Sequence, residues 1–345
     1  MSASATLSAA RPAPLATTGI GSLPHTQLEV GMQLALSVDV PYLPELPRRE
    51  AAECFTAQAL EALPGLHSEP SCRLTLDLEA WQRGSFELDA RLDEADERGS
   101  VESFLPSASC EAWSPFLWEV ASRRLTFAKV QCAGPATVLA AVSAGSRTSL
   151  PAPLEQQVVR LVLDRALAMA RAVRAAGAVP IVFLDEPMIG AVRRASPAAQ
   201  ARELDLLRHA VLGLRNEGAI TGLHCCGEAD WAPLLRLGLD LLSFDATVSL
   251  QRLLVERPDV ERFLESGGWL GLGLVPTDAK SEAERTQRLS ATLAALEALP
   301  KALRTQILTQ SLLTPACGLG TRSIEETERV FESLVASQAR LRALL

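Results

Sequence analysis

The 345-residue chain has no excess of positive charge, because 33 Lys and Arg residues stand against 41 Asp and Glu residues, a net charge of −8. This deficit argues against nucleic acid and against an anionic membrane surface as partners. Lysine is scarce, and its three residues are Lys129, Lys280 and Lys301. Arginine therefore carries nearly all the positive charge, which we attribute to genomic base composition and not to function.

Long apolar runs are also missing. No window offers the ~20 uninterrupted apolar residues that a membrane-spanning helix needs, so we expect no membrane span. The first 16 residues are rich in Ala, Ser and Pro, but they lack the basic start and apolar block of a signal peptide. We therefore expect residues 1–16 to form a flexible tail.

A regular cysteine framework is absent too. The seven cysteines are an odd number at irregular spacings, which argues against disulfides and for a reducing, cytoplasmic compartment. Free cysteine is among the most buried residue types. We therefore expect Cys54, Cys72, Cys110 and Cys132 to be small unpaired core residues.

Short apolar runs that alternate with amphipathic stretches dominate the rest of the chain. Apolar residues make up 48% of the sequence and charged residues 21%, the balance of a globular protein with a sizeable core. Eight runs are candidate strands: Thr18–Leu23, Val40–Leu43, Ala128–Ala133, Val179–Leu184, Ile220–Cys225, Leu239–Phe244, Trp269–Val275 and Ile307–Leu313. The clearest candidate helices are Leu154–Ala176, Ala198–Asn216, Glu282–Leu299 and Ile324–Leu345.

This alternation predicts an α/β fold of the (β/α)8 TIM-barrel type, a single domain over residues 17–345. Parallel strands joined through helices account for the pattern, and eight such units favour a closed barrel over an open sheet. The polar region of about 64–118 is expected to be an insertion after the second strand. Within it, Cys72–Glu79 alternates apolar and polar residues, which predicts a small hairpin.

Metal-ligating residue types gather at predicted strand ends, where the active sites of such barrels form. His224 and Cys226 are two residues apart in Gly-Leu-His-Cys-Cys-Gly, so on an extended segment they face the same side while Cys225 faces the packing. Cys317 follows the eighth strand and Asp245 follows the sixth. One imidazole, two thiolates and a carboxylate suit zinc.

Two further strand ends offer polar groups. Asp185 ends the run Phe-Leu-Asp-Glu-Pro and is expected to accept hydrogen bonds from a substrate ammonium group, the alternative being a helix cap. The segment Thr18–His25 contains Gly21 and Ser22, where glycine lets a ligand approach the backbone closely. A tight turn between strand and helix explains that segment equally well.

Taken in order, the strings TTGIGSLP, FLDEP, GLHCCG and TPACGLGTR resemble the C-terminal catalytic barrel of cobalamin-independent methionine synthase. That barrel belongs to a superfamily with uroporphyrinogen decarboxylase and zinc-dependent thiol methyltransferases. The resemblance runs from about Thr17 to the C-terminus. It implies that His224, Cys226 and Cys317 are zinc ligands, and that Asp245 replaces a Glu ligand.

The resemblance also implies a substrate site. Gly21 and Ser22 match the loop that holds the homocysteine carboxylate, and Asp185 matches the acid that binds its amino group. Glu45 matches a second acid for that amine, although its spacing from Ser22 is shorter than in the synthase. No counterpart of the synthase's N-terminal barrel precedes residue 17, and Leu274–Thr277 lacks its histidine.

The leading hypothesis is therefore a zinc-dependent methyltransferase in which His224, Cys226, Cys317 and Asp185 carry the chemistry. Its acceptor would be a small thiol, with homocysteine giving methionine, and its donor a methyl-corrinoid, free or protein-bound, or a methylfolate. Three alternatives stay open: methyl transfer involving another small thiol, a metal-free decarboxylase of the uroporphyrinogen type, and a non-catalytic barrel.

Overall fold

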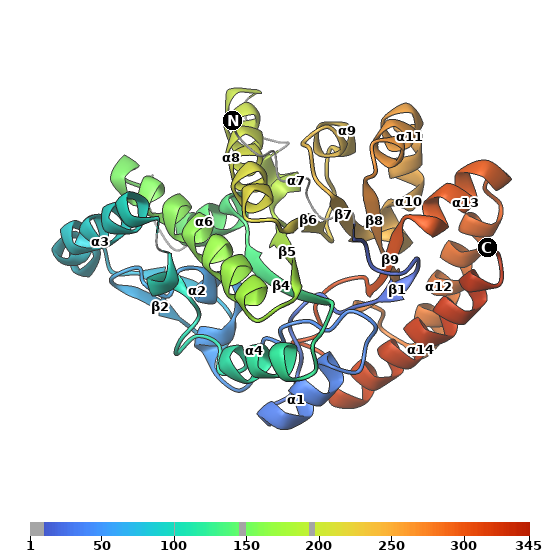
Figure 1. Ribbon diagram of the computed structural model, residues 1–345, viewed down its shortest axis with the longest axis horizontal. Helices are drawn as coiled ribbons and strands as arrows, with labels where there is room; N and C mark the ends of the chain where they lie inside the picture. The colour runs from blue at the N-terminus through green and yellow to red at the C-terminus, as the bar shows by residue number, and fades with distance from the viewer. Residues whose placement is uncertain (1–9, 100, 145–149, 193–196) are drawn as a thin grey trace.

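A curled, parallel seven-stranded sheet forms the centre of the computed structural model, which describes residues 10–99, 101–144, 150–192 and 197–345 (Figure 1). The strand order is β1-β9-β8-β7-β6-β5-β4, and every neighbouring pair is parallel. The strands are β1 Ala16–Thr17, β4 Phe127–Ala133, β5 Val179–Asp185, β6 Ile220–Cys225, β7 Leu241–Asp245, β8 Trp269–Val275 and β9 Ser311–Pro315. The mixed α/β class expected from the sequence is confirmed.

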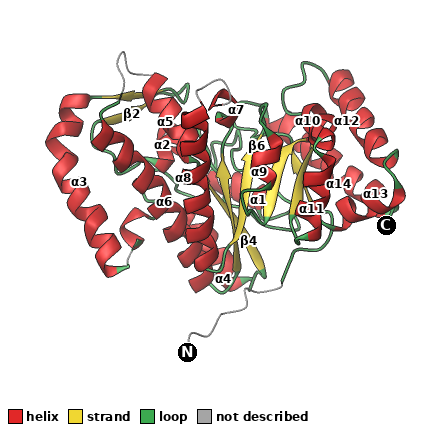
Figure 2. Cartoon of the chain, turned by 90° about the horizontal axis from the view of Figure 1, so that it is seen from above, coloured by secondary structure: helices red, strands yellow, loops and turns green. Residues whose placement is uncertain are grey.

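Helices surround this sheet, with β2, α2 and α3 gathered at one side (Figures 1 and 2). Their bounds are α1 Leu28–Ala35, α2 Phe55–Ala59, α3 Leu78–Arg98, α4 Trp113–Ser122, α5 Pro135–Ala144, α6 Ala152–Ala175, α7 Ile189–Val192, α8 Pro197–Asn216, α9 Trp231–Leu235, α10 Ala246–Val255, α11 Arg257–Glu265, α12 Glu282–Glu297, α13 Lys301–Thr309 and α14 Ile324–Arg342, with short 3-10 turns at Ala51–Glu53 and Glu102–Phe104. In the described residues, no helix is long and apolar enough to cross a bilayer.

Alternation along each strand sorts side chains between two environments. On β4, Ala128, Val130 and Cys132 pack into the main core beneath the helices. A separate small cluster, which includes Phe183 of β5, is made by side chains on the opposite face of the strands. Lys129 and Gln131 therefore share the inner face of the sheet with that apolar cluster.

Residues 40–45 lie between the two ends of the sheet. The N–H of Val40 donates to the carbonyl of Thr17 beside β1 (3.0 Å), and the N–H of Leu43 donates to Lys129 of β4 (2.9 Å). Single bridges pair Ser22 with Glu45 and Tyr42 with Lys129. The segment predicted as the second strand therefore contacts both ends of the sheet, and it places Glu45 on the same inner face.

The insertion contains a hairpin, in which β2 (Leu66–Ser68) pairs antiparallel with β3 (Leu74–Leu76). Most of the rest is helical, because α3 runs for 21 residues from the side-chain cap of Asp77 to Gly99, whose φ of 60° ends it. Cys54 and Cys72 form a disulfide that ties the start of α2 to the hairpin turn. The expectation that these two cysteines are unpaired is therefore wrong, since the fold brings their Cα atoms to 5.6 Å.

A partly buried polar cluster pins the insertion to α6. The carboxylate of Glu61 accepts hydrogen bonds from the hydroxyls of Ser107 and Ser109, both at 2.5 Å, and from Arg165 at 2.9 Å. Burial alone would raise the pKa of Glu61, but these hydrogen bonds and the Arg165 charge lower it to about 2. Folding therefore stabilises the ionised form of this carboxyl.

Three predicted boundaries shift in the structure. Residues 307–309 belong to α13, so β9 starts later than expected, because their apolar side chains cover the sheet from a helix. The first strand, β1 at Ala16–Thr17, comes just before the expected range Thr18–Leu23, in which Ser22 makes a single bridge. The predicted tail is shorter than 16 residues, since Arg11 pairs with Asp240 at 3.0 Å and Leu15 is fully buried; residues 1–9 lie outside the described part.

Candidate metal and thiol site

A cavity of about 550 Å³ opens at the C-terminal ends of the strands. Its lining includes the predicted site residues Ser22, Glu45, Asp185, His224, Cys226 and Cys317, together with Arg48, Phe55 and the Cys54–Cys72 disulfide. Residues predicted from five separate segments of the sequence thus meet at one place. This is the end of a parallel α/β sheet where ligands bind.

His224, Cys226 and Cys317 form the centre of this cavity. One ligand atom from each lies within 4.8 Å of the other two. Among the His, Cys, Asp and Glu side chains of the described residues, these three form the group whose spacing could hold a metal ion. His224 comes from the end of β6, Cys226 from the loop directly after it, and Cys317 from the loop after β9. An imidazole and two thiols within this distance match the nitrogen and sulfur donors of zinc.

The imidazole is oriented by Ser243 of β7. Nδ1 of His224 lies 3.0 Å from the Ser243 hydroxyl, and its Nε2 is buried with no hydrogen-bond partner in the described part of the chain. Space for Ser243 depends on Gly271 of β8, where a Cβ would lie 2.6 Å from the serine Cβ. Ser243 was not predicted from the sequence; its signal was a single hydroxyl inside the apolar strand Leu241–Asp245.

The two thiols interact directly. The pKa of Cys317 is lowered to about 4 because the Cys226 thiol donates a hydrogen bond to its sulfur and His224 lies beside it. The same hydrogen bond, together with burial, raises the pKa of Cys226. Cys225 is fully buried in the core and faces away from this pair, as predicted from strand alternation.

Asp245 lies apart from the group, which corrects its expected role as a fourth ligand. Its Oδ1 accepts hydrogen bonds from the backbone N–H and the hydroxyl of Thr247, at 2.8 and 2.7 Å, and so caps α10. Its Oδ2 faces Arg288 at 3.8 Å. The shorter side chain of aspartate suits a cap on its own helix, and the group with metal-site spacing does not include it.

Two carboxylates, Glu45 and Asp185, line the same cavity and are almost fully buried. Burial and the charge of Asp185 raise the pKa of Glu45 to about 8. Burial also raises the pKa of Asp185, to about 6, against the opposing influence of His224 and Lys129. Oδ1 of Asp185 is buried with no partner among the described residues, so it is ready to accept a hydrogen bond from a ligand.

The adjacent acid, Glu186, has the capping role considered for Asp185. Its carboxylate accepts hydrogen bonds from the N–H groups of Ala136 and Thr137, at 3.0 and 2.9 Å, and so caps the start of α5. A Cβ on Gly134 would lie 2.2 Å from Glu186 Oε1, so glycine is needed at that position. The two neighbouring acids therefore have separate tasks, one structural and one directed at the cavity.

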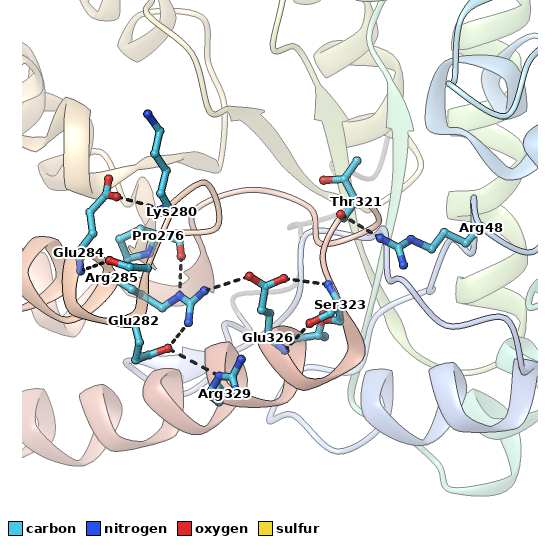
Figure 3. A network of polar contacts seen from close by, with 12 residues as sticks. Arg48, Pro276, Lys280, Glu282, Glu284, Arg285, Thr321, Ser323, Glu326 and Arg329 are labelled. Atoms are coloured by element: carbon cyan, nitrogen blue, oxygen red, sulfur yellow. Dashed lines mark hydrogen bonds and ion pairs between the residues drawn. The ribbon is translucent and has the colours of Figure 1, made fainter.

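Contacts from distant segments hold the loop that follows Cys317. The Ser22 carbonyl accepts from Leu319 N–H (2.8 Å), and its hydroxyl accepts from Gly320 N–H (3.3 Å). The Arg48 guanidinium donates to the carbonyls of Gly320 and Thr321, at 3.0 and 2.9 Å (Figure 3). These contacts orient Cys317, and they leave Arg48 fewer N–H groups for the several carboxylates of a uroporphyrinogen-like substrate.

The far side of this loop is equally constrained. It leads into α14, whose N-terminus is capped by Ser323 and Glu326 in a reciprocal capping box (Figure 3). Buried Arg285 faces Glu326 at 3.9 Å and donates to the carbonyl of Pro276 at 3.4 Å. Cys317 therefore lies in a segment fixed at both ends, as preorganised metal ligands require.

Comparison with known proteins gives little further information. No family model matches the chain, and no curated protein matches it. Among solved structures, it is similar to a crystal structure of D-psicose 3-epimerase in the presence of D-fructose. That match has 10% sequence identity and a TM-score of 0.32, and it covers 64% of this chain and 91% of the other. A likeness this distant carries no argument about activity.

Proposed function

We propose that this protein is a zinc-dependent thiol methyltransferase with a methionine-synthase-like (β/α)8 barrel, in which residues 40–45 take the place of the second strand. The observation that carries the proposal is the group His224, Cys226 and Cys317 in one cavity with two buried acids. A structural zinc site would have no need of the two acids. An acid pair alone would not account for the neighbouring thiols.

The residues present fit a zinc ion. His224 offers a buried Nε2 that has no partner among the described residues, and two thiols lie within 4.8 Å of its ligand atoms. His224, Cys226 and Cys317 would hold the ion as three protein ligands, the number typical of catalytic zinc sites with an open position. Zinc, when bound, favours the thiolate form of a coordinated thiol.

The remaining residues would select and orient the acceptor. Glu45 and Asp185 would accept hydrogen bonds from the ammonium group of an amino-acid thiol, while Ser22 and the nearby N–H groups would hold its carboxylate. In the reaction, the acceptor sulfur forms a bond to the methyl carbon and the donor leaves with the electron pair of the broken bond. The thiol proton is released, and the fixed orientation of the acceptor lowers the barrier.

Metal content and turnover, measured on the same samples, test this proposal. We expect about one zinc per chain in the wild-type protein, and its loss in the Cys317→Ser variant. We also expect homocysteine-dependent demethylation of methylcobalamin, with methylfolate as the second donor to try. Replacement of Asp245 with Asn should leave the zinc content unchanged, because Asp245 caps α10.

The alternatives predict different results. Zinc binding with turnover of other thiols but not homocysteine would replace the acceptor and keep the reaction class. Zinc binding without turnover of any thiol and donor pair would favour a non-catalytic barrel. Absence of zinc under reducing, metal-replete conditions would refute the proposal and favour the metal-free decarboxylase.

A further inference from the structure

The side chain of Lys129, on the end strand β4 of the sheet, is fully buried. Its ammonium donates to the carbonyl of Ile20 (2.5 Å) and to Oε1 of Gln131 (2.9 Å), and it lies 4.5 Å from the centre of the Phe183 ring. A buried ammonium is costly unless charges nearby compensate it. The methyl-transfer steps above give this residue no task.

Lys129 is electrostatically coupled to both acids of the cavity, Asp185 and Glu45. Glu53, another carboxylate that acts on Glu45, faces Arg49, which Glu111 contacts more closely. Asp185 is also influenced by His224 and Cys317, whereas Lys129 is the cation that acts on Glu45. A ligand ammonium group that lies between the two acids would add a second positive charge beside them.

Gln131 links Lys129 to Glu45 by hydrogen bonds. Because the lysine ammonium can only donate, it must face the oxygen of the Gln131 amide, which leaves the nitrogen to face the other way. That nitrogen donates to Oε1 of Glu45 at 3.1 Å and to the carbonyl of Leu43 at 2.8 Å. A Cβ on Gly21 would lie 2.7 Å from the same nitrogen, so this glycine makes room for the link.

We propose that Lys129 is a positioning residue: it supplies the resident positive charge that lets Glu45 and Asp185 both accept from one ligand ammonium. This role rests on the proposed amino-acid thiol as ligand. With Lys129 removed, a single ligand cation would face two buried carboxylates, and the Gln131 amide would lose the donor that fixes it toward Glu45. Lys129 would then determine preference for a ligand with an amino group, without touching the ligand.

Calorimetry tests this role. It would measure the binding of methionine and of its deaminated analogue, 4-(methylthio)butanoate, to the zinc-loaded and to the metal-free protein. We expect the wild-type protein to prefer methionine, and Lys129→Met to reduce that preference by about tenfold or more, the effect of losing a charge-assisted hydrogen bond. The analogue should bind the variant within about threefold of wild type, because it lacks the amino group. Lys301→Met, the same change on an exposed lysine, is the control.

Gln131→Met provides a second variant if Lys129→Met does not fold. It keeps the buried cation but breaks the link to Glu45, and we expect it to reduce the preference for methionine. If either folded variant keeps the wild-type preference, or loses affinity for both ligands equally, the role of Lys129 is overturned while the proposed function stands. A wild-type protein without any preference for methionine overturns both this role and the proposed amino-acid acceptor.

Discussion

The hydrogen bond between Ser243 and His224 allows a quantitative prediction about metal affinity. In the Ser243→Ala variant the imidazole loses the partner that lies 3.0 Å from its Nδ1, in a place where both side chains are buried. Loss of such an outer partner typically weakens metal binding by about 10- to 100-fold, or about 1.4 to 2.8 kcal/mol. This agrees with the ~1–3 kcal/mol cost of leaving a buried polar atom unpaired.

Competition with a chromophoric zinc chelator would measure the affinity of wild type and variant. Ser311→Ala is the matched control. The buried Ser311 hydroxyl donates to the carbonyl of Ile307 at the N-terminal end of β9, away from the cavity at the C-terminal ends of the strands. We expect that control to lower the midpoint of thermal unfolding and to leave zinc affinity unchanged. Equal zinc affinities of wild type and Ser243→Ala, or an equal loss in both variants, would refute the reasoning.

Three other predictions concern stability. Because the pKa of Glu61 falls from 4.5 in the reference state to about 2 in the fold, its stabilising contribution is present above about pH 4.5 and is lost as the pH falls toward 2. Glu61→Gln should therefore cost about 1–2 kcal/mol in urea unfolding at pH 7 and much less at pH 3, and an equal cost at both pH values would contradict this. Gly134→Ala should destabilise the protein by about 1–3 kcal/mol, because the added methyl group clashes with Glu186. Gly213→Ala in α8, whose new Cβ would have 3.6 Å of clearance, should stabilise it by up to ~1 kcal/mol. Thermal unfolding compares the two variants, and a more stable Gly134→Ala than Gly213→Ala would contradict the prediction. Thiol titration of the denatured protein should count five thiols without reductant and seven with it, and seven thiols without reductant would exclude the disulfide. The double variant Cys54→Ser, Cys72→Ser should lower the free energy of unfolding by about 2–4 kcal/mol.

Regular elements with strong periodicity were predictable because their patterns are local. The run at 179–184 and the helix at 154–176 appear in the structure within two residues of their predicted bounds, as β5 and α6. The apolar residues of the helix recur with the helical period, and the strand is a short unbroken apolar run. The insertion was harder, since α3 is a polar helix whose α-helical character depends on its caps and on packing against α6.

The amino-acid sequence alone was enough to locate the chemical groups, because parallel strands direct their C-terminal ends to one side. For that reason His224, Cys226, Cys317 and Asp185 could be assigned to one cavity before any distance was known, whereas Glu45 was assigned from the family resemblance. Spacing in the sequence could not tell which carboxylate faces a ligand and which one caps a helix.

Only the tertiary structure separated those roles. Asp245 and Glu186 both follow strands as Asp185 does, yet they satisfy backbone N–H groups, because the start of a helix lies within their reach. Pairing of Cys54 with Cys72, and the contact of Ser243 with His224, each join residues that are 18 or 19 positions apart. Such contacts depend on how the elements pack, which no local pattern encodes.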